Sequence, residues 1–388
     1  VALAAAGALE TTSETYRRWI SEYSSQGFGE LADELGSLLD ACFAGCQATP
    51  DEGEAELLAE VEGLYVQAME HELAFFGQFG LEGTGQEAQR RALLRAARIV
   101  PPRVLIIAGS DSGGGAGIQA DVKACAALGA FSTTAIAALT AQNSAGVQGI
   151  YPIPVEFVQQ QMRSVLDDLG ADVVKTGMLA TSAIVKSVVE GLADRTSSVE
   201  RWRRRLVVDP VMVSTSGHQL LEDDAVDSVK KHLFPIATII TPNLCEASLL
   251  LEGRKIDSVE AMRQAAVDLC AMGPRWVLLK GGHLQEVMPK SGADAGAAGA
   301  ECVDVLCDRR TGRCELFGSP FVATTRTHGT GCTLASSVAA LLARGSTVPE
   351  AVREAKAYVH GAIASSAHLA LGTGPQGAMN HSWRTVDW

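Results

Sequence analysis

The pattern of hydrophobic and polar positions changes near residue 103. Beyond it, short apolar and β-branched runs alternate with stretches in which apolar residues recur every three or four positions. The runs are VLIIAG, FSTTAIAAL, DVVKTGM, LVVDPV, TIITPN and WVLLKGG, and the helical stretches include 116–129, 155–169, 222–233 and 258–272. Strands alternating with helices form βαβ units. The sequence therefore predicts an α/β fold with a mostly parallel sheet and helices on both faces.

Residues 1–80 have a different pattern and are predicted to form an all-helical segment. Apolar positions recur there at helical spacing, as at Tyr16, Trp19 and Tyr23. A Gly-, Gln- and Arg-rich linker is predicted for 81–102, and it closes at Pro101-Pro102, a pair through which a helix rarely continues. Residues 103–388 form the predicted second domain, interrupted at 291–300 by a low-complexity insertion, SGADAGAAGA.

Composition narrows the classes of function. The chain has 388 residues, of which 47% are hydrophobic, so it can bury a large core. Its net charge of −13 argues against a nucleic-acid partner, which needs basic patches. A phosphorylated small molecule is still compatible with this charge, because backbone N–H groups can hold a phosphate.

The cysteines and the absence of long apolar runs bear on location. No apolar run reaches the roughly 18 residues of a membrane span. The nine cysteines are scattered, as is typical of a reducing compartment, and Cys302, Cys307 and Cys314 lack zinc-site spacing. Residue 1 is valine, so we expect the natural start to lie upstream. We expect a cytosolic protein, or a plastid one if a transit peptide precedes this segment.

The informative polar residues follow the predicted strands. The segments AGSDSGGG, KTGM, DPVM, TPN and KGGH all lie at strand ends, and in open parallel sheets ligands bind at that edge. The first segment matches neither common nucleotide motif. Its three consecutive glycines nevertheless allow a ligand to approach the backbone closely, although a merely flexible turn would look the same.

The segment THGTGC, residues 327–332, precedes an apolar helix. Gly329, Thr330, Gly331 and Cys332 would stand where the first helical N–H groups have no internal partner, which makes an anion pocket. A thiol at such a helix start has a lowered pKa, so Cys332 is a candidate base. The alternative is a small core cysteine beside a glycine cap.

Three further residues suit the handling of phosphate. Asp209 in VVDPVM and Glu246 in TPNLCEA lie at or just beyond strand ends, where carboxylates can hold Mg²⁺ directly or through water. Lys280 ends WVLLK and could neutralise phosphate oxygens. Taken singly, each has an ordinary structural alternative, such as a helix-start acid or an edge lysine.

Other residues suit an organic substrate. Gln142 carries both a donor and an acceptor, as needed to read an aminopyrimidine edge, and Asp121 is a second polar candidate. Met178 could line an apolar wall or fill the core. Together with the phosphate-handling residues, these are the parts that phosphoryl transfer requires.

Residues 103 to about 383 resemble the hydroxymethylpyrimidine/phosphomethylpyrimidine kinases of thiamine biosynthesis, in the ribokinase-like superfamily. AGSDSGGGAGIQAD, TAQNS, KTGM, VVDPVM, TPNLCEA, KGGH, THGTGC and GTGP occur in family order. The resemblance implies a three-layer fold and an ATP- and Mg²⁺-dependent kinase. It also implies that Cys332 takes the place of the aspartate base of sugar kinases.

The resemblance also implies roles for the other candidates. They are pyrimidine contacts from Asp121, Gln142 and Met178 with the backbone near Gly109, ATP phosphate contacts from Lys280, Gly329, Thr330 and Gly331, and Mg²⁺ contacts from Asp209 and Glu246. The sequence departs from the family pattern at Arg326, where a shorter polar residue is usual, in an insertion at 285–300 and in a longer tail. We expect the insertion and the tail to alter the nucleotide rim.

The N-terminal segment resembles the C-terminal half of the TenA/thiaminase II family. YRRWISEY and HELAFF match two of its helices, and Glu72 falls on that family's active-site glutamate. The half that carries the nucleophilic cysteine is missing here, and neither Cys42 nor Cys46 replaces it. We expect no hydrolase activity from this segment.

Two other functions stay open from the sequence. One is a pyridoxal or pyridoxine kinase on the same fold, and the other is a catalytically silent pyrimidine-binding regulator. The set Lys280, Asp209 and Cys332 argues against the silent regulator. A homodimer is expected only by analogy with relatives.

Overall fold

The computed structural model describes residues 100–193, 205–212, 223–282, 284, 301–375 and 377–386. The residues from Val100 onwards form one compact unit. The predicted helical segment, with Cys42, Cys46 and Glu72, lies outside the described residues, as do most of the linker and the 285–300 insertion. The predicted domain boundaries therefore stay predictions.

The described residues contain a mixed sheet of nine strands in the order β3-β2-β1-β4-β5-β6-β7-β8-β9. The central strands run parallel: β1 (Arg103–Asp111), β2 (Phe131–Asn143), β4 (Val173–Thr176), β5 (Leu206–Val208), β6 (Ile239–Ile240) and β7 (Trp276–Leu279). The outer strands are antiparallel: β3 (Gly146–Pro152), β8 (Glu301–Asp308) and β9 (Cys314–Pro320). Each of the six apolar runs coincides with all or part of one parallel strand, so the predicted mostly parallel sheet is confirmed.

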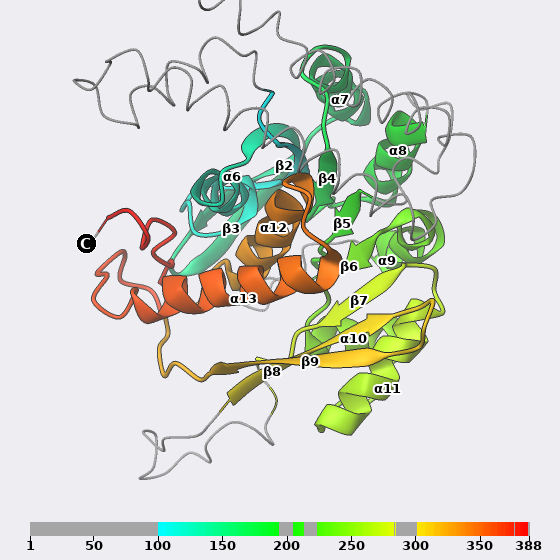
Figure 1. Cartoon of the computed structure of the whole chain (residues 1–388). Coiled ribbons are helices and arrows are strands. Elements are labelled where there is room, and N and C mark those ends of the chain that lie inside the picture. Colours follow the sequence, from blue (N-terminus) through cyan, green and yellow to red (C-terminus); the bar gives the residue numbers. More distant parts are fainter. Residues whose placement is uncertain are drawn as a thin grey trace, which may run out of the picture. The chain divides into compact units, whose positions relative to one another are not determined.

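Helices cover both faces of this sheet and give three layers (Figure 1). One face carries α6 (Gly117–Ala127), α12 (Thr330–Ala343) and α13 (Val348–Ala364). The other carries α7 (Val155–Asp168), α8 (Ser182–Ala193), α9 (Asp223–Ser228), η2 (Val229–Leu233), η3 (Phe234–Ile236), α10 (Leu244–Leu250) and α11 (Val259–Cys270). The four predicted helical stretches are confirmed, with 222–233 divided into a short α-helix and a π-turn.

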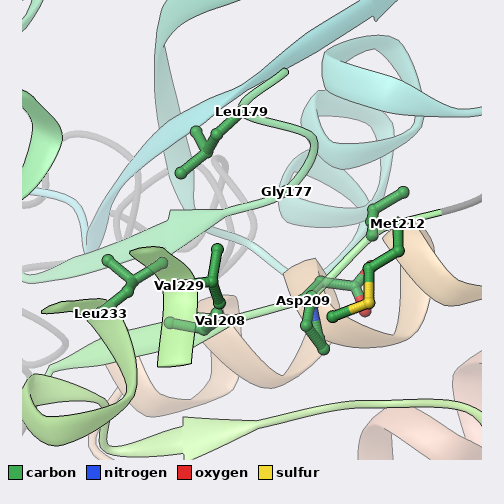
Figure 2. Close-up of a pocket in the computed structure, with 9 residues that line it drawn as sticks. Gly177, Leu179, Val208, Asp209, Met212, Val229 and Leu233 are labelled. Atoms are coloured by element: carbon green, nitrogen blue, oxygen red, sulfur yellow. The ribbon is translucent and has the colours of Figure 1, made fainter. Parts of the chain in front are cut away.

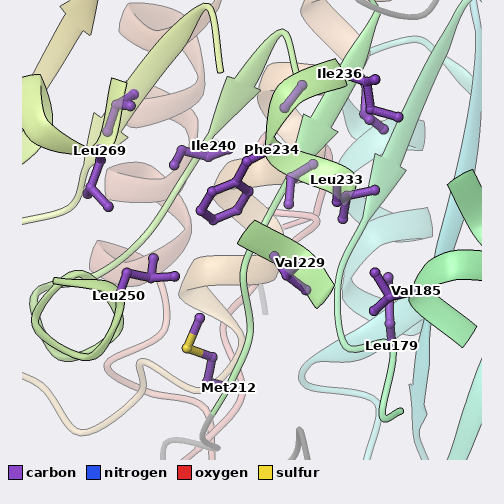
Figure 3. Packing of buried hydrophobic residues seen from close by; sticks show 14 of the residues in the cluster. Leu179, Val185, Met212, Val229, Leu233, Phe234, Ile236, Ile240, Leu250 and Leu269 are labelled. Atoms are coloured by element: carbon purple, nitrogen blue, oxygen red, sulfur yellow. The ribbon is translucent and has the colours of Figure 1, made fainter. Parts of the chain in front are cut away.

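The central strands β1, β4, β5, β6 and β7 are mostly apolar because both of their faces are buried. Along β1, Leu105 and Ile107 pack into the core cluster beneath α7 and α8, whereas Val104 and Ile106 pack into the cluster beneath α6 and α12. This alternation is the two-residue period of a strand. Figure 3 shows part of the first cluster, in which Phe234 lies among aliphatic side chains from several elements. The two core clusters hold the parallel strands in position, and the residues that follow the carboxyl ends of these strands therefore lie along the same edge of the sheet.

Strand pairing at the edge of the sheet has a consequence for the cysteines. Cys307 on β8 lies directly opposite Cys314 on β9, with their Cα atoms 4.1 Å apart, and the two form a disulfide. The scattered spacing of the cysteines had pointed to a reducing compartment and predicted no such pair. Only the hairpin register shows that these two side chains meet.

Among the described helices, none has both the length and the apolar character needed to cross a membrane.

Candidate active site

The loop between β1 and α6 is folded around the carboxylate of Asp111. Oδ1 accepts a hydrogen bond from the N–H of Gly113 (2.8 Å), and Oδ2 accepts from those of Gly115 (3.0 Å) and Ala116 (2.8 Å). His328 Nε2, from the segment before α12, lies 3.0 Å from Oδ2. Burial opposes ionisation, but these partners hold the pKa of Asp111 below its ordinary value. One buried carboxylate therefore ties the glycine loop to the start of α12.

Gln142 lies beside the same histidine. Its Nε2 is 3.2 Å from His328 Nε2, and its Oε1 accepts from the Thr140 hydroxyl at 3.2 Å. Its backbone N–H donates to the Ser112 hydroxyl at 2.8 Å, which anchors the end of β2 to the glycine loop. The half-buried Gln142 side chain is thus held at the rim of this loop, where a substrate edge could be read.

Met178 and Gly109 are in contact. A Cβ atom at Gly109 would lie 3.1 Å from Met178 Sδ, so a larger residue there would press on the thioether. Met178 is 6% exposed and packs with Ala138 and Ala180. Met178 therefore borders the end of β1 from within a small apolar cluster.

The start of α12 is open to an anion. Gly329 is its N-cap residue, no side chain caps the helix, and its first turn contains no acidic residue. The N–H of Thr330 donates to Thr327 O at 3.2 Å, so the N–H groups of Gly331 and Cys332, at the positive end of the helix dipole, are the ones available to an anion. The Thr330 hydroxyl donates to Thr327 O at 2.6 Å and so stiffens the turn. A Cβ at Gly331 would lie 3.2 Å from Lys280 Nζ and 3.7 Å from Asp209 Oδ2, so this charged pair borders the helix start.

A substitution at Gly329 tests directly whether the start of α12 contacts the loop between β1 and α6. The φ of Gly329 is 85°, and a Cβ atom would lie 1.8 Å from Gly115 O. We expect Gly329→Ala to destabilise the fold by at least about 3 kcal/mol, because the left-handed conformation and the overpacking both add cost. Gly345→Ala is the matched control, since Gly345 has φ 97° but nothing within 4 Å. It should cost only about 1–2 kcal/mol. Equal losses in urea unfolding would contradict the predicted contact.

Lys280 and Asp209 form the charged centre of the site. Lys280 Nζ lies 3.0 Å from Asp209 Oδ1, which also accepts from the Thr241 hydroxyl at 2.9 Å. Asp209 is only 2% exposed. Burial alone would lower the pKa of Lys280, but Asp209 and Glu246 raise it, so the ammonium stays charged.

Glu246 lies in the first turn of α10 and forms a capping box with the N-cap residue Asn243. Its Oε2 accepts from the Asn243 N–H at 2.8 Å, and the Asn243 side chain accepts from the Glu246 N–H at 2.9 Å. Burial raises the pKa of Glu246 to about 7; Lys280 opposes this rise, and the negative charge of Asp209 adds to it.

This arrangement of carboxylates fits a Mg²⁺ ion. The two carboxylates repel each other, and a divalent cation between them would relieve that repulsion. No three His, Cys, Asp or Glu side chains gather as a metal-binding group within the described ranges. Asp209 and Glu246 would therefore hold Mg²⁺ only together with water or phosphate oxygens, which is how proteins usually bind this ion.

Cys332 occupies the first turn of α12 and is half-buried. The nearby backbone N–H of Gly117 favours the anionic form of its sulfur and so lowers the thiol pKa slightly. Burial raises the pKa of the thiol to about 12, although Lys175 lowers it. The sequence-based expectation of a lowered pKa is therefore wrong, because desolvation outweighs the helix start and the neighbouring cation.

The structure also corrects the expected contact between Asp121 and a substrate. Asp121 is 0% exposed. Its oxygens accept from Lys175 Nζ at 2.9 and 2.8 Å, and Oδ1 also accepts from the Ser336 hydroxyl at 2.7 Å. Burial raises its pKa, and Lys175 opposes that rise. A carboxylate enclosed in this way lies beneath α12 and does not line an open surface.

A small pocket opens at the ends of β4 and β5 (Figure 2). It is lined by Gly177, Leu179, Val208, Asp209, Pro210, Val211, Met212, Val229 and Leu233. Asp209 is the one ionisable side chain among these described lining residues. It therefore stands between the charged cluster and an apolar space.

Three residues in this site were not among the predicted functional residues: Asp111, His328 and Lys175. Asp111 had a recognisable signal, because an Asp just before a glycine run often accepts from the following N–H groups. His328 and Lys175 lie in the quoted segments THGTGC and KTGM, but their partners could not be predicted, because each meets its partner only through the tertiary fold.

A known protein family matches the part of the chain that contains these site residues. Residues 111–377 match the family model described as phosphomethylpyrimidine kinase. The chain belongs to this family.

Members of the phosphomethylpyrimidine kinase family are among its similar proteins. The "Hydroxymethylpyrimidine/phosphomethylpyrimidine kinase" of Streptomyces coelicolor is 47% identical over 285 residues, 74% of this chain and 96% of that protein. The "Thiamine biosynthetic bifunctional enzyme TH1, chloroplastic" of Arabidopsis thaliana is 48% identical over 280 residues, 72% of this chain and 50% of that protein. The chain thus spans about half the length of its plant relative.

A solved structure shows the same fold. The ADP complex of Bacillus subtilis pyridoxal kinase superposes with a TM-score of 0.61 and 32% identity, over 73% of this chain and 98% of that one. This likeness and the three layers confirm the predicted fold class for the described residues.

Proposed function

We propose that this chain uses ATP to phosphorylate 4-amino-5-hydroxymethyl-2-methylpyrimidine and then its monophosphate, giving the pyrophosphate used in thiamine synthesis. The observation that carries the proposal is the cluster at the start of α12. There Lys280, Asp209 and the Cys332 thiol lie around an uncapped helix N-terminus. Phosphoryl transfer depends mainly on positioning and charge neutralisation, and this cluster supplies both.

The phosphates of ATP would lie against Lys280 and the first N–H groups of α12. The Lys280 ammonium is held at 3.0 Å by Asp209, so it is oriented before a ligand arrives. Gly329, Thr330 and Gly331 leave the backbone accessible, because none of them places a bulky side chain over the N–H groups. Asp209 and Glu246 would hold Mg²⁺, which when bound neutralises charge on the phosphate oxygens.

Cys332 would accept the proton of the substrate hydroxyl as the oxygen attacks the γ-phosphorus. Because burial holds its thiol pKa near 12, only a small fraction is ionised at neutral pH. The reaction should then accelerate as pH rises. The second phosphorylation has less need of a base, since a phosphate monoester with a second pKa near about 6 is already an anion.

The pyrimidine would lie over the glycine loop, with its polar edge toward Gln142 and its ring toward Gly109 and Met178. The support for this placement is that the Asp111 contacts bring the loop, Gln142 and the start of α12 together. Asp121 takes no direct part in it.

The test is ADP formation with each candidate substrate, followed by mass analysis of the product. We expect ADP with the hydroxymethylpyrimidine and with its monophosphate, and a mass gain of first one and then two phosphoryl groups. A strong preference for pyridoxal would overturn the substrate assignment and favour the activity named for the Bacillus relative. No ADP with any of them would favour the silent regulator. The compartment and a homodimeric state stay predictions.

A further inference from the structure

Beneath α12 lies a buried ion pair that the proposed mechanism does not use. Lys175, at the end of β4, and Asp121, on α6, are both 0% exposed. The ammonium lies 2.9 and 2.8 Å from the two carboxylate oxygens. Replacing such a pair with apolar residues is often neutral or stabilising, so its contribution to stability alone is a weak reason for it.

The pair lies on the face of α12 that carries Cys332. Ser336, whose hydroxyl donates to Asp121 Oδ1 at 2.7 Å, comes one helical turn after Cys332 and so shares its face. A Cβ at Gly177 would lie 3.0 Å from Lys175 Nζ, which places the ammonium beneath the turn that follows β4. The backbone N–H of Gly117, in the first turn of the helix that carries Asp121, also lowers the pKa of the Cys332 thiol.

Four charged groups face Cys332 from the surrounding elements: Lys175 on β4, Asp121 on α6, Asp209 after β5 and Lys280 after β7. The two carboxylates oppose an anionic sulfur and the two lysines favour it. Lys280 already forms an ion pair with Asp209, with Nζ 3.0 Å from Oδ1. Lys175 is the strongest of the influences that lower the thiol pKa.

We propose that Lys175 is a positioning residue whose buried charge stabilises the anionic form of Cys332, and that Asp121 and Ser336 hold it in place. Only one part of this inference rests on the proposed function, namely that the anionic sulfur acts in catalysis. Its physical content, one buried cation acting on one sulfur, can be measured without any kinase assay.

The experiment measures the rate at which iodoacetamide alkylates Cys332 between pH 8.5 and 10.5, resolved by peptide mass spectrometry. Only the thiolate reacts, so the rate follows the ionised fraction. We expect Lys175→Met to slow alkylation of Cys332 at least about tenfold at each pH, which is a shift of about one pKa unit. Asp121→Asn should do the opposite and accelerate it, because it removes a negative charge and leaves the cation.

The opposite signs separate this role from a structural one. Loosening of the fold would expose Cys332 and accelerate alkylation in both variants. Exposed Cys245 is the internal reference in every sample and should react at an unchanged rate. If Lys175→Met does not fold, the double variant Lys175→Met/Asp121→Leu, which removes both charges of this pair, should still slow the reaction, because Lys175 has the larger effect on the thiol.

A matched control uses the second buried lysine of this unit. Lys356 Nζ lies 2.6 Å from Asp304 Oδ2 and lowers the pKa of Cys302, against the larger effect of burial. Lys356→Met should therefore slow alkylation of Cys302 and leave Cys332 unchanged. Unchanged or faster alkylation of Cys332 in folded Lys175→Met or in the double variant would overturn the proposal. Failure of the ADP assay with these alkylation results intact would overturn only the proposed function.

Discussion

Replacing Cys332 with alanine is expected to reduce kcat for the first phosphorylation by about 10²–10⁴-fold, the usual contribution of a general base. KM values should change little, because in the proposed mechanism the sulfur would contact the reacting proton and not the bulk of either substrate. The second phosphorylation should lose less, since its nucleophile is already anionic. The measurement is the rate of ADP formation from ATP, with the hydroxymethylpyrimidine and its monophosphate assayed separately. Equal losses in both steps, or none, would remove Cys332 from the role of base.

Two further variants sharpen this result. The wild-type kcat/KM should rise with pH from 7 to at least 9, since the thiol pKa lies near 12 and the base must be ionised. Cys332→Asp should flatten this rise, because a carboxylate is ionised throughout that range. Cys270→Ala is the matched control. It removes a thiol whose pKa burial also raises to about 12, but on α11, across the sheet from α12. Its activity should stay at the wild-type level.

Replacing Lys280 with methionine is expected to lower kcat/KM for ATP by about 10²–10³-fold, the usual loss when one preorganised charge-stabilising donor is removed. The change also leaves Asp209 buried without its cation, which should cost about 3–5 kcal/mol of stability. Urea unfolding and initial ADP rates, measured on the same preparation, separate the two effects.

Lys255→Met serves as the control for Lys280. Lys255 pairs with Asp257 at 2.6 Å, but its side chain is 84% exposed. Exposed pairs contribute little, so neither rate nor stability should change measurably. A Lys280→Met enzyme that keeps full activity while folded would contradict the assignment of Lys280 to the phosphates.

The sequence predicted the parallel part of this fold well because buried parallel strands leave a simple trace. The run VLIIAG lies within β1, and β5 lies within LVVDPV; both strands are buried on both faces. β3, β8 and β9 lie at the sheet edges, and their mixed burial gives no comparable run. The pairing of Cys307 with Cys314 depends on the register of that outer hairpin, which the spacing of cysteines does not carry.

The site was predictable in its members but not in their surroundings. Strand-end position alone brought Asp209 and Lys280 to one edge, where they form an ion pair. The burial of Asp121 depends on α12 folding over α6, a contact between segments more than two hundred residues apart. The pKa of Cys332 has the same origin. The helix start favours a thiolate, but the desolvation that overrides it depends on what packs above the turn.

The Asp111 carboxylate contacts Gly113, Gly115, Ala116 and His328, and these contacts join residues 113–116 rigidly to the segment before α12. A ligand that restricts the motion of the first segment therefore also restricts the motion of the second. A second ligand that binds at the other segment then loses less conformational entropy on binding. Occupancy at either segment then favours occupancy at the other, by the same factor in both directions.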